Sequence, residues 1–389
     1  MAKQIVRILD DISPSELKLR NMSRPIDGLY NMFINELGQV EKRKGYAKYN
    51  TTSIGADHKI VGMHRFYKQD TSSKEFLVAW NTDIYKLAET SPHGATSIKT
   101  GLTADKDTYF VDFLNHCYFV NGADGMFKYN LTNVRTVGIT VPDAPTFNAN
   151  INGSLTAGTY YFKYTFVDED GYESNGSPAS AAMTAEADPN DGIKINIAAS
   201  SDPKVTKRRI YRTTVGGAIY YYDGEVADNT TLTYDSTQAD NTLGSAIETD
   251  HDAPPSDPHL ITKRRNRLYL GHDDDLVISQ LSDCEYFPPA WFIKTGNRQK
   301  ITGLVEQLNA LPVFTENSIE RLLGTDEDNF EFRNAFSKKG CYAIRSLVIC
   351  DNLLIYLSYD GIYYFDGVTS GIFNQRLNKY IKDNINRTY

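Results

Sequence analysis

Apolar and polar residues alternate along the stretch Asn352 to Gly367, which reads NLLIYLSYDGIYYFDG. Residues 353–358 follow a period of two, and this is the period of a β-strand. Asp360-Gly361 then supplies a dipeptide that favours positive φ in a tight hairpin turn, and Ile362 to Phe365 continue as the return strand. The stretch therefore predicts one β-hairpin.

The same order of apolar run, short polar turn and second apolar run occurs four more times in the chain. The four copies are Phe76 to Leu87, Asn115 to Tyr129, Asn266 to Ser279 and Ala310 to Leu323. The first two begin about 40 residues apart and the last three about 43 residues apart, which is the period of a four-stranded β-propeller blade. We therefore expect an all-β protein built around a β-propeller.

The regular spacing is interrupted once, by about 110 extra residues, which is the size of one immunoglobulin-like domain. The interruption contains about seven short alternating segments, among them Gly158 to Val167 and Lys207 to Thr213. Prolines mark both of its ends, at Pro142 and Pro258. The pattern predicts an inserted sandwich of the immunoglobulin or fibronectin type III kind.

These periodicities divide the chain into four predicted parts. Residues 1–141 hold an N-terminal arm and the first blades, 142–258 the inserted sandwich, 259–373 the remaining blades, and 374–389 a short C-terminal helix. The helix is predicted because Leu377, Tyr380, Ile381 and Ile385 have helical spacing after Asn374, a possible N-cap.

Composition narrows the possible functions. The chain has 389 residues and a formal net charge of −8, so no general attraction to DNA or to an anionic membrane is expected. Four scattered cysteines predict buried free thiols and maturation in a reducing cytoplasm rather than a disulfide framework. The N-terminal sixteen residues carry charges inside their only apolar patch, so we expect no signal peptide there. No apolar run is long enough to predict a membrane-spanning segment.

Acidic clusters are the first candidates for chemistry. His272 to Asp275 is either a metal-binding group or a hairpin turn, and the turn is favoured because aspartate bonds readily to nearby backbone. Asp168 and Asp170 begin like a calcium loop, but Ala179 stands where the last acidic ligand is needed. Asp250 to Asp252 fall in a proline-rich linker, where we expect no scaffold to hold them rigid. We therefore predict no enzyme, no cofactor and no metal ligand.

Three basic runs, Lys42 to Lys44, Lys207 to Arg209 and Lys263 to Arg265, are the second candidates. Solvated strand edges explain each run, and a docking or lumen-facing patch is the alternative. The segment Asn21 to Tyr49 has no place in the blade repeat and combines aromatic with basic residues, which serve as anchors in protein interfaces. We predict an assembly interface there, made by Arg24, Tyr30, Lys42, Arg43, Lys44 and Tyr46.

Several of these motifs resemble a known family. Arg24-Pro25, Asn31-Met32 and Lys42 to Tyr46 are similar to the opening of the tail nozzle, tail tubular protein B or stabilisation proteins of short-tailed bacteriophages. Ala157 to Ser177 resembles their sandwich domain, and Tyr359 to Gly367 resembles one of their later blades. The similarity extends from about Arg20 to Gly367.

The resemblance implies a structural subunit of a virion made in the host cytoplasm. Such a subunit forms a homo-oligomeric ring, a hexamer, below the portal and adaptor, and viral DNA passes through its lumen without sequence-specific binding. Its roles are virion assembly, genome retention and DNA ejection. Two other functions remain open: a glycan-acting or lectin-like propeller, and an adhesion scaffold with a fibronectin-like arm.

Overall fold

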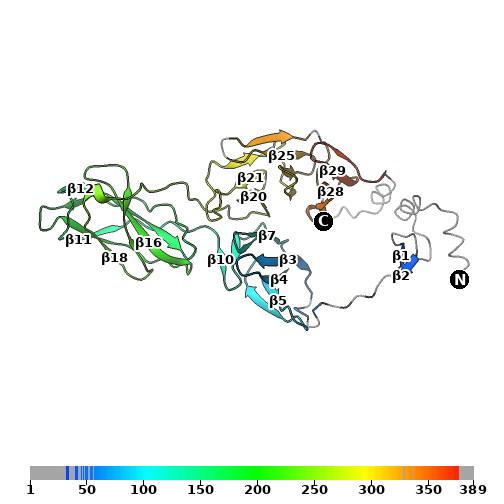
Figure 1. Cartoon of the computed structure of the whole chain (residues 1–389), viewed down its shortest axis with the longest axis horizontal. Coiled ribbons are helices and arrows are strands. Elements are labelled where there is room, and N and C mark those ends of the chain that lie inside the picture. Colours follow the sequence, from blue (N-terminus) through cyan, green and yellow to red (C-terminus); the bar gives the residue numbers. More distant parts are fainter. Residues whose placement is uncertain are drawn as a thin grey trace, which may run out of the picture. The chain divides into compact units, whose positions relative to one another are not determined.

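The computed structural model describes residues 57–326, 329–335 and 337–375, together with residues 32–34, 40–42, 45, 47, 49, 50 and 53–55. The protein is all-β, as the sequence predicts (Figure 1). Its described residues divide into two compact units, one made of residues 58–86 and 97–294 and the other of the remainder. Among the described residues, the helices are two short 3₁₀ turns, Asp240–Thr242 and Ile344–Ser346, and the single helical residue Gln375.

Five four-stranded antiparallel sheets form the repeated part of the chain, each with its strands in sequence order. The first contains β3 (Ile60–Lys68), β4 (Ser73–Trp80), β5 (Asp83–Leu87) and β6 (Ala95–Lys99). The second contains β7 (Tyr109–Phe113), β8 (His116–Val120), β9 (Phe127–Tyr129) and β10 (Val134–Thr136). The third contains β19 (Leu260–Arg264), β20 (Arg267–His272), β21 (Asp275–Ile278) and β22 (Phe292–Lys294).

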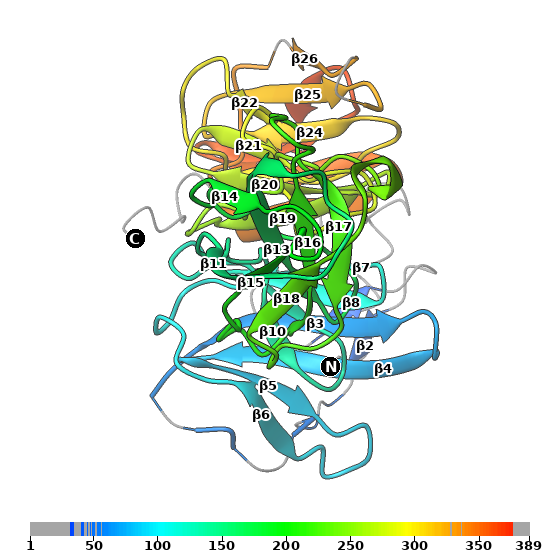
Figure 2. The same cartoon turned by 90° about the vertical axis from the view of Figure 1, so that its left-hand side faces the viewer.

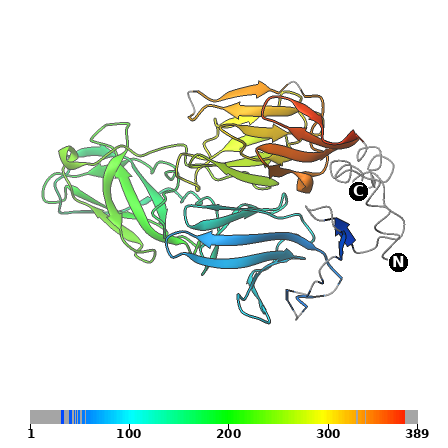
Figure 3. The ribbon, with the colours of Figure 1, turned by 45° about the vertical axis from the view of Figure 1, so that its right-hand side comes forward.

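The last two sheets are drawn in orange and red in Figure 3. One contains β23 (Gly303–Leu304), β24 (Leu311–Phe314), β25 (Ile319–Leu323) and β26 (Glu331–Asn334). The other contains β27 (Val348–Cys350), β28 (Leu353–Ser358), β29 (Gly361–Phe365) and β30 (Ser370–Ile372). A separate two-stranded sheet pairs β1 (Met32–Ile34) with β2 (Val40–Lys42).

The five predicted hairpins are confirmed as the two middle strands of the five sheets. The predicted turn of the last hairpin is displaced by one residue, because Ser358 pairs with Gly361 and leaves Tyr359 and Asp360 as the turn. Gly361 opens the return strand at φ 150°, a conformation that favours glycine. The alternation of apolar residues therefore predicts the position of the hairpin correctly. The Asp-Gly dipeptide places the centre of the turn one residue too late.

Consecutive sheets share apolar cores within each unit. Phe119 and Phe127 of the second sheet pack with Val61 and Ala79 of the first. Leu268 and Leu270 of the third sheet join the core of the second. The first strand of the second sheet, β7, lies beside both β3 and β19. The first three sheets therefore pack on one another through apolar residues and have neighbouring first strands.

The segment between the second and third sheets holds eight strands in three sheets (Figure 2). They are β11 (Thr146–Ile151), β12 (Gly158–Tyr160), β13 (Phe162–Asp168), β14 (Met183–Ala185), β15 (Gly192–Asn196), β16 (Val205–Arg212), β17 (Tyr221–Val226) and β18 (Thr233–Ser236). Residues of all three sheets, among them Tyr160, Phe162 and Ile193, face one core. We call this segment the sandwich.

The sandwich lies in the same compact unit as most of the first sheet and all of the second and third sheets. Its independent folding, and the boundaries at residues 142 and 258, stay predictions. The C-terminal helix predicted from Asn374 lies, after Gln375, outside the described residues. Within the described part of the chain, no helix combines the length and the apolar character that a membrane span requires.

Candidate functional site: a buried ionic junction

The sandwich is joined to its neighbouring sheets by a cluster of buried charges, which we call the junction. It consists of Lys128 on β9, Asp168 and Asp170 at the end of β13, Lys204 just before β16, and Glu285 in the β21–β22 loop. The side chains of Lys128, Asp168, Lys204 and Glu285 are 0–2% exposed. Three elements far apart in the sequence therefore meet at one buried point.

Lys128 is the centre of the junction. Its Nζ lies 3.1 Å from Oδ2 of Asp168, 2.5 Å from Oδ2 of Asp170 and 2.8 Å from Oε1 of Glu285. The same Nζ stands 5.5 Å from the centre of the Tyr172 ring, a cation–π distance. The ammonium of Lys128 thus joins the second sheet to the sandwich and to the loop that follows β21.

Lys204 forms the second half of the junction. Its Nζ donates to the carbonyl oxygens of Thr136 (2.6 Å) and Gly138 (2.8 Å) and to Oε2 of Glu285 (3.1 Å). The Gly138 N–H also donates to that oxygen, at 2.6 Å. Because a buried ion costs several kcal/mol unless it is paired and hydrogen-bonded, these contacts offset the desolvation of both ions.

Burial and the neighbouring charges shift the pKa values of the junction residues. Burial alone would lower the pKa of Lys128, but the carboxylates of Glu285 and Asp168 raise it overall. Burial raises the pKa of Asp168, and Lys128 opposes the shift. Burial also raises the pKa of the neighbouring Asp283 to about 7, assisted by the negative charges of Glu285 and Asp168.

Aromatic packing extends the junction towards the chain that returns from the sandwich. The ring of His251 stacks on Tyr286 with centroids 3.8 Å apart, and Tyr286 meets Tyr172 edge to face. The Tyr286 hydroxyl accepts a hydrogen bond from the backbone N–H of Glu173. His251 is only 7% exposed. The expectation that residues 250–252 lack a packed scaffold is therefore wrong for His251, whereas Asp250 is exposed.

The junction has the chemistry of a structural contact between elements rather than of a catalytic site. Lys128, Lys204 and Glu285 are completely or almost completely enclosed, so a substrate has no surface on which to meet them. Each of the three has an ion-pair partner within 3.1 Å, and such polar clusters fix one arrangement of the elements that they join. We infer that the junction holds the sandwich in a fixed position on the second and third sheets.

Asp283 gives a pH-dependent test of the junction. Above pH 4 an unfolded aspartate has lost its proton, whereas native Asp283 keeps it up to about pH 7, so this group lowers stability as the pH rises from 4 to 7. We expect Asp283→Asn to raise the free energy of unfolding at pH 8 by about 1–2 kcal/mol, less than the full shift because the side chain is only partly buried. Urea unfolding at pH 5 and pH 8 measures this.

The variant keeps the oxygen that accepts the backbone N–H of Glu285, at 2.9 Å, so the loop geometry is preserved. At pH 5 the variant and the unmodified protein should differ less than at pH 8. An equal difference at both values would contradict the shifted titration of Asp283.

The acidic groups singled out in the sequence have structural partners. Asp168 accepts the backbone N–H groups of Asp170 and Tyr172 in the turn after β13, and its other oxygen pairs with Lys128. His272 to Asp275 connect β20 to β21, as the turn interpretation predicts. Lys294 of β22 pairs with Asp275 at 2.6 Å, and His272 pairs with Asp257, which precedes β19, at 3.0 Å.

The solvated-edge interpretation of the basic runs is wrong for Lys207 to Arg209. Their strand β16 lies between β13 and β17, so it is not an edge. Arg208 is fully buried, and its guanidinium donates to the carbonyl oxygens of Asp228 and Ala198. In the Lys263 to Arg265 run, Arg264 is also buried, at 1% exposure.

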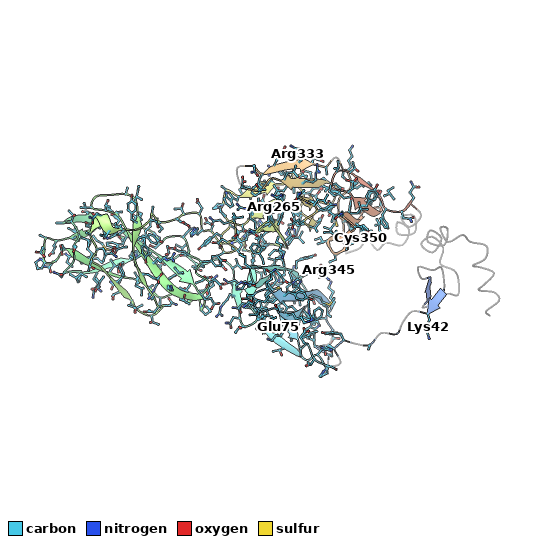
Figure 4. The ribbon with its side chains drawn as sticks, viewed as in Figure 1. Lys42, Glu75, Arg265, Arg333, Arg345 and Cys350 are labelled. Carbon is cyan, nitrogen blue, oxygen red and sulfur yellow. The ribbon has the colours of Figure 1, made fainter. Side chains whose placement is uncertain are left out.

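Of the six predicted assembly residues, one lies within the described part of the chain. Lys42 is exposed at the end of β2 (Figure 4), whereas Arg24, Tyr30, Arg43, Lys44 and Tyr46 lie outside the described residues. The cysteine prediction is correct for Cys117, Cys284 and Cys341, which are buried free thiols. It is wrong for Cys350, which is exposed on β27.

No protein-family model and no curated protein matches this sequence. Among solved structures, the chain is similar to the extracellular domain of a protein described as a one-component system from B. thetaiotaomicron, with a TM-score of 0.32 and 10% identity over 84% of this chain and 35% of that one. It is also similar to the computationally designed Ika8 protein, with a TM-score of 0.26 and 10% identity over 81% of this chain and 86% of that one. A hybrid two-component system's extracellular domain from B. thetaiotaomicron gives a TM-score of 0.23 and 8% identity over 87% of this chain and 56% of that one.

The chain thus spans about a third of the length of the first of these structures, as its 35% coverage shows. Likenesses at these TM-scores support no argument about the arrangement of the sheets or about function.

Proposed function

We propose that the chain is a structural subunit of a bacteriophage tail or neck, which forms a homo-oligomeric ring around the DNA channel. In this proposal the five four-stranded sheets are blades of one β-propeller, and the sandwich is an arm fixed to it. The ring is a hexamer that contacts the adaptor below the portal and contributes to genome retention and DNA ejection. The net charge of −8 suits a conduit that lets DNA pass without binding it.

The observation that carries the proposal is the junction. A subunit that must keep its place in a ring under load needs its domains held in one orientation, and an ordinary flexible linker would not provide this. Lys128 and Lys204 connect the second sheet, the sandwich and the β21–β22 loop through buried ion pairs. This construction favours a load-bearing scaffold, in agreement with the family that the sequence resembles.

Immunolabelling of purified virions tests the location. Antibody raised against the purified chain should decorate the tail or neck in negative-stain images, with particles of a phage that lacks this gene as the control. Label on the host cell surface with none on virions would overturn the proposal and favour an adhesion scaffold. Binding or cleavage of a glycan by the purified chain would favour the glycan-acting alternative.

A substitution test addresses assembly. Replacing Lys42, Arg43 and Lys44 by Ser should leave folding intact and abolish incorporation into particles, because basic and aromatic anchors serve in interfaces. The matched control replaces three exposed lysines elsewhere, Lys59, Lys106 and Lys300, by Ser and removes the same charge. Normal incorporation of the first variant would exclude its basic run as an assembly determinant.

A further inference from the structure

We propose that His64, Asp112 and Cys117 form a binding site for a transition-metal ion, with Zn²⁺ as the ion that this set of ligands favours. His64 lies on β3, Asp112 on β7 and Cys117 on β8, all within one compact unit. One ligand atom from each residue lies within 4.8 Å of the other two. The site is independent of the proposed function.

Strand pairing places the three side chains together. Asp112 and Cys117 are direct cross-strand partners of the β7–β8 hairpin, so their side chains leave the sheet on the same face. His64 comes from β3, which lies beside β7, and its Nε2 is 2.6 Å from Oδ1 of Asp112. Sites held on strands keep their geometry better than sites held on loops.

The donor set is that of a zinc site. A thiolate, an imidazole and a carboxylate are three ligand types that Zn²⁺ accepts, and three protein ligands leave the fourth tetrahedral position to water. Zn²⁺–ligand distances of about 2.0–2.3 Å hold the ligands roughly 3.3–3.8 Å apart. The 2.6 Å separation of His64 and Asp112 must therefore open, which side-chain torsions of these partly exposed residues allow.

Neighbouring groups already orient the ligands. Oδ2 of Asp112 accepts the backbone N–H of Tyr67 at 3.1 Å, which leaves Oδ1 directed at His64. The imidazole of His64 stacks on Phe110, with centroids 5.7 Å apart and planes 5° apart. Outer contacts of this kind fix ligand orientation in metal sites.

Exposure provides a path for the ion. The side chains of His64 and Asp112 are 25% and 23% exposed, whereas Cys117 is fully buried behind them among Phe66, Leu77 and Tyr129. An ion can therefore reach the site from solvent and bind the thiolate last. A lysine also lies close to the ligands, because Nζ of Lys263 donates a hydrogen bond to the backbone carbonyl oxygen of Asp112 at 2.6 Å.

Cobalt titration of the full-length chain tests the site, because Co²⁺ adopts zinc geometries and reports a bound thiolate by charge-transfer absorption. After chelator treatment, we expect one Co²⁺ per chain with a thiolate band, and loss of the band on adding Zn²⁺. Cys117→Ser should abolish the band, and His64→Gln should weaken Co²⁺ binding at least tenfold. The matched controls Cys350→Ser, at the exposed cysteine, and His58→Gln, at a histidine paired with Asp105, should keep both.

A thermal melt supplies a second measurement that needs no variant at the buried cysteine. Zn²⁺ should raise the Tm of the unmodified chain and of His58→Gln, because a ligand of the native state stabilises it, and should raise the Tm of His64→Gln less. Absence of a thiolate band in the unmodified chain, or an equal Zn²⁺ effect in His64→Gln, would overturn the proposal. The three residues would then be an ion pair beside a core thiol.

Discussion

Replacement of Lys128 by Met is expected to lower the free energy of unfolding by about 3–5 kcal/mol, because it leaves the buried carboxylate of Asp168 without its cation and Glu285 with Lys204 alone. Asp168 and Glu285 are fully enclosed, and Lys128 is within 3.1 Å of both. Met keeps most of the volume of the lysine side chain, so the loss reports charge rather than a cavity. Urea unfolding followed by far-ultraviolet circular dichroism measures it.

Two further variants define the origin of that loss. Lys194→Met removes a lysine of the same compact unit that pairs with Asp235 at the surface, and it should cost no more than about 1 kcal/mol. Adding Asp168→Asn to Lys128→Met removes one orphaned charge and should recover part of the stability. If Lys128→Met and Lys194→Met cost the same, the junction does not behave as a buried ionic cluster.

Replacement of Gly340 by Ala should cost about 2–3 kcal/mol, because a side chain does not fit there. A Cβ at this position would overlap the carbonyl oxygen of Thr315 and lie 2.8 Å from the carbonyl carbon of Glu316. These are backbone atoms of the β24–β25 turn, to which the N–H groups of Gly340 and Cys341 are bonded at 3.2 and 2.9 Å. The turn must move for the methyl group to fit.

Gly125→Ala is the matched control, since a Cβ there meets no atom within 4 Å. The two variants should therefore separate by at least about 1 kcal/mol in urea unfolding. A Gly340→Ala protein as stable as Gly125→Ala would show that the turn relaxes freely.

The strands were predictable because their cause is local. Alternation along Phe76 to Leu87 or Asn266 to Ser279 needs only one buried face and one turn, and both hairpins form where the pattern places them. The arrangement of the sheets has a different cause, because cores such as that of Leu268 with Tyr118 join residues far apart in the sequence. Hydrophobic period does not specify which distant face a strand meets.

The junction could not be predicted for the same reason. Lys128 lies between Phe127 and Tyr129 in an apolar strand, and this placement was the one local signal that its ammonium is buried. Nothing near it in the sequence indicates Glu285 as its partner. The sequence around Asp168 begins like a calcium loop, whereas the cation that pairs with Asp168 is Lys128 of another sheet. Arg208 is likewise buried, although it lies in the basic run Lys207 to Arg209, for which the sequence predicts a solvated strand edge.

The order in which the junction partners leave the ribosome has a consequence for folding. Glu285 is 147 residues after Gly138 and 81 residues after Lys204, both of which it contacts. At synthesis rates of about 5–20 residues per second, the second sheet therefore waits roughly 7–30 s for the carboxylate that completes its contacts. During that interval Lys128 and Lys204 have no Glu285 to pair with, so the nascent second sheet and sandwich are held together less firmly. Final docking of the sandwich thus belongs to a late step of biogenesis, after the β21–β22 loop has been made.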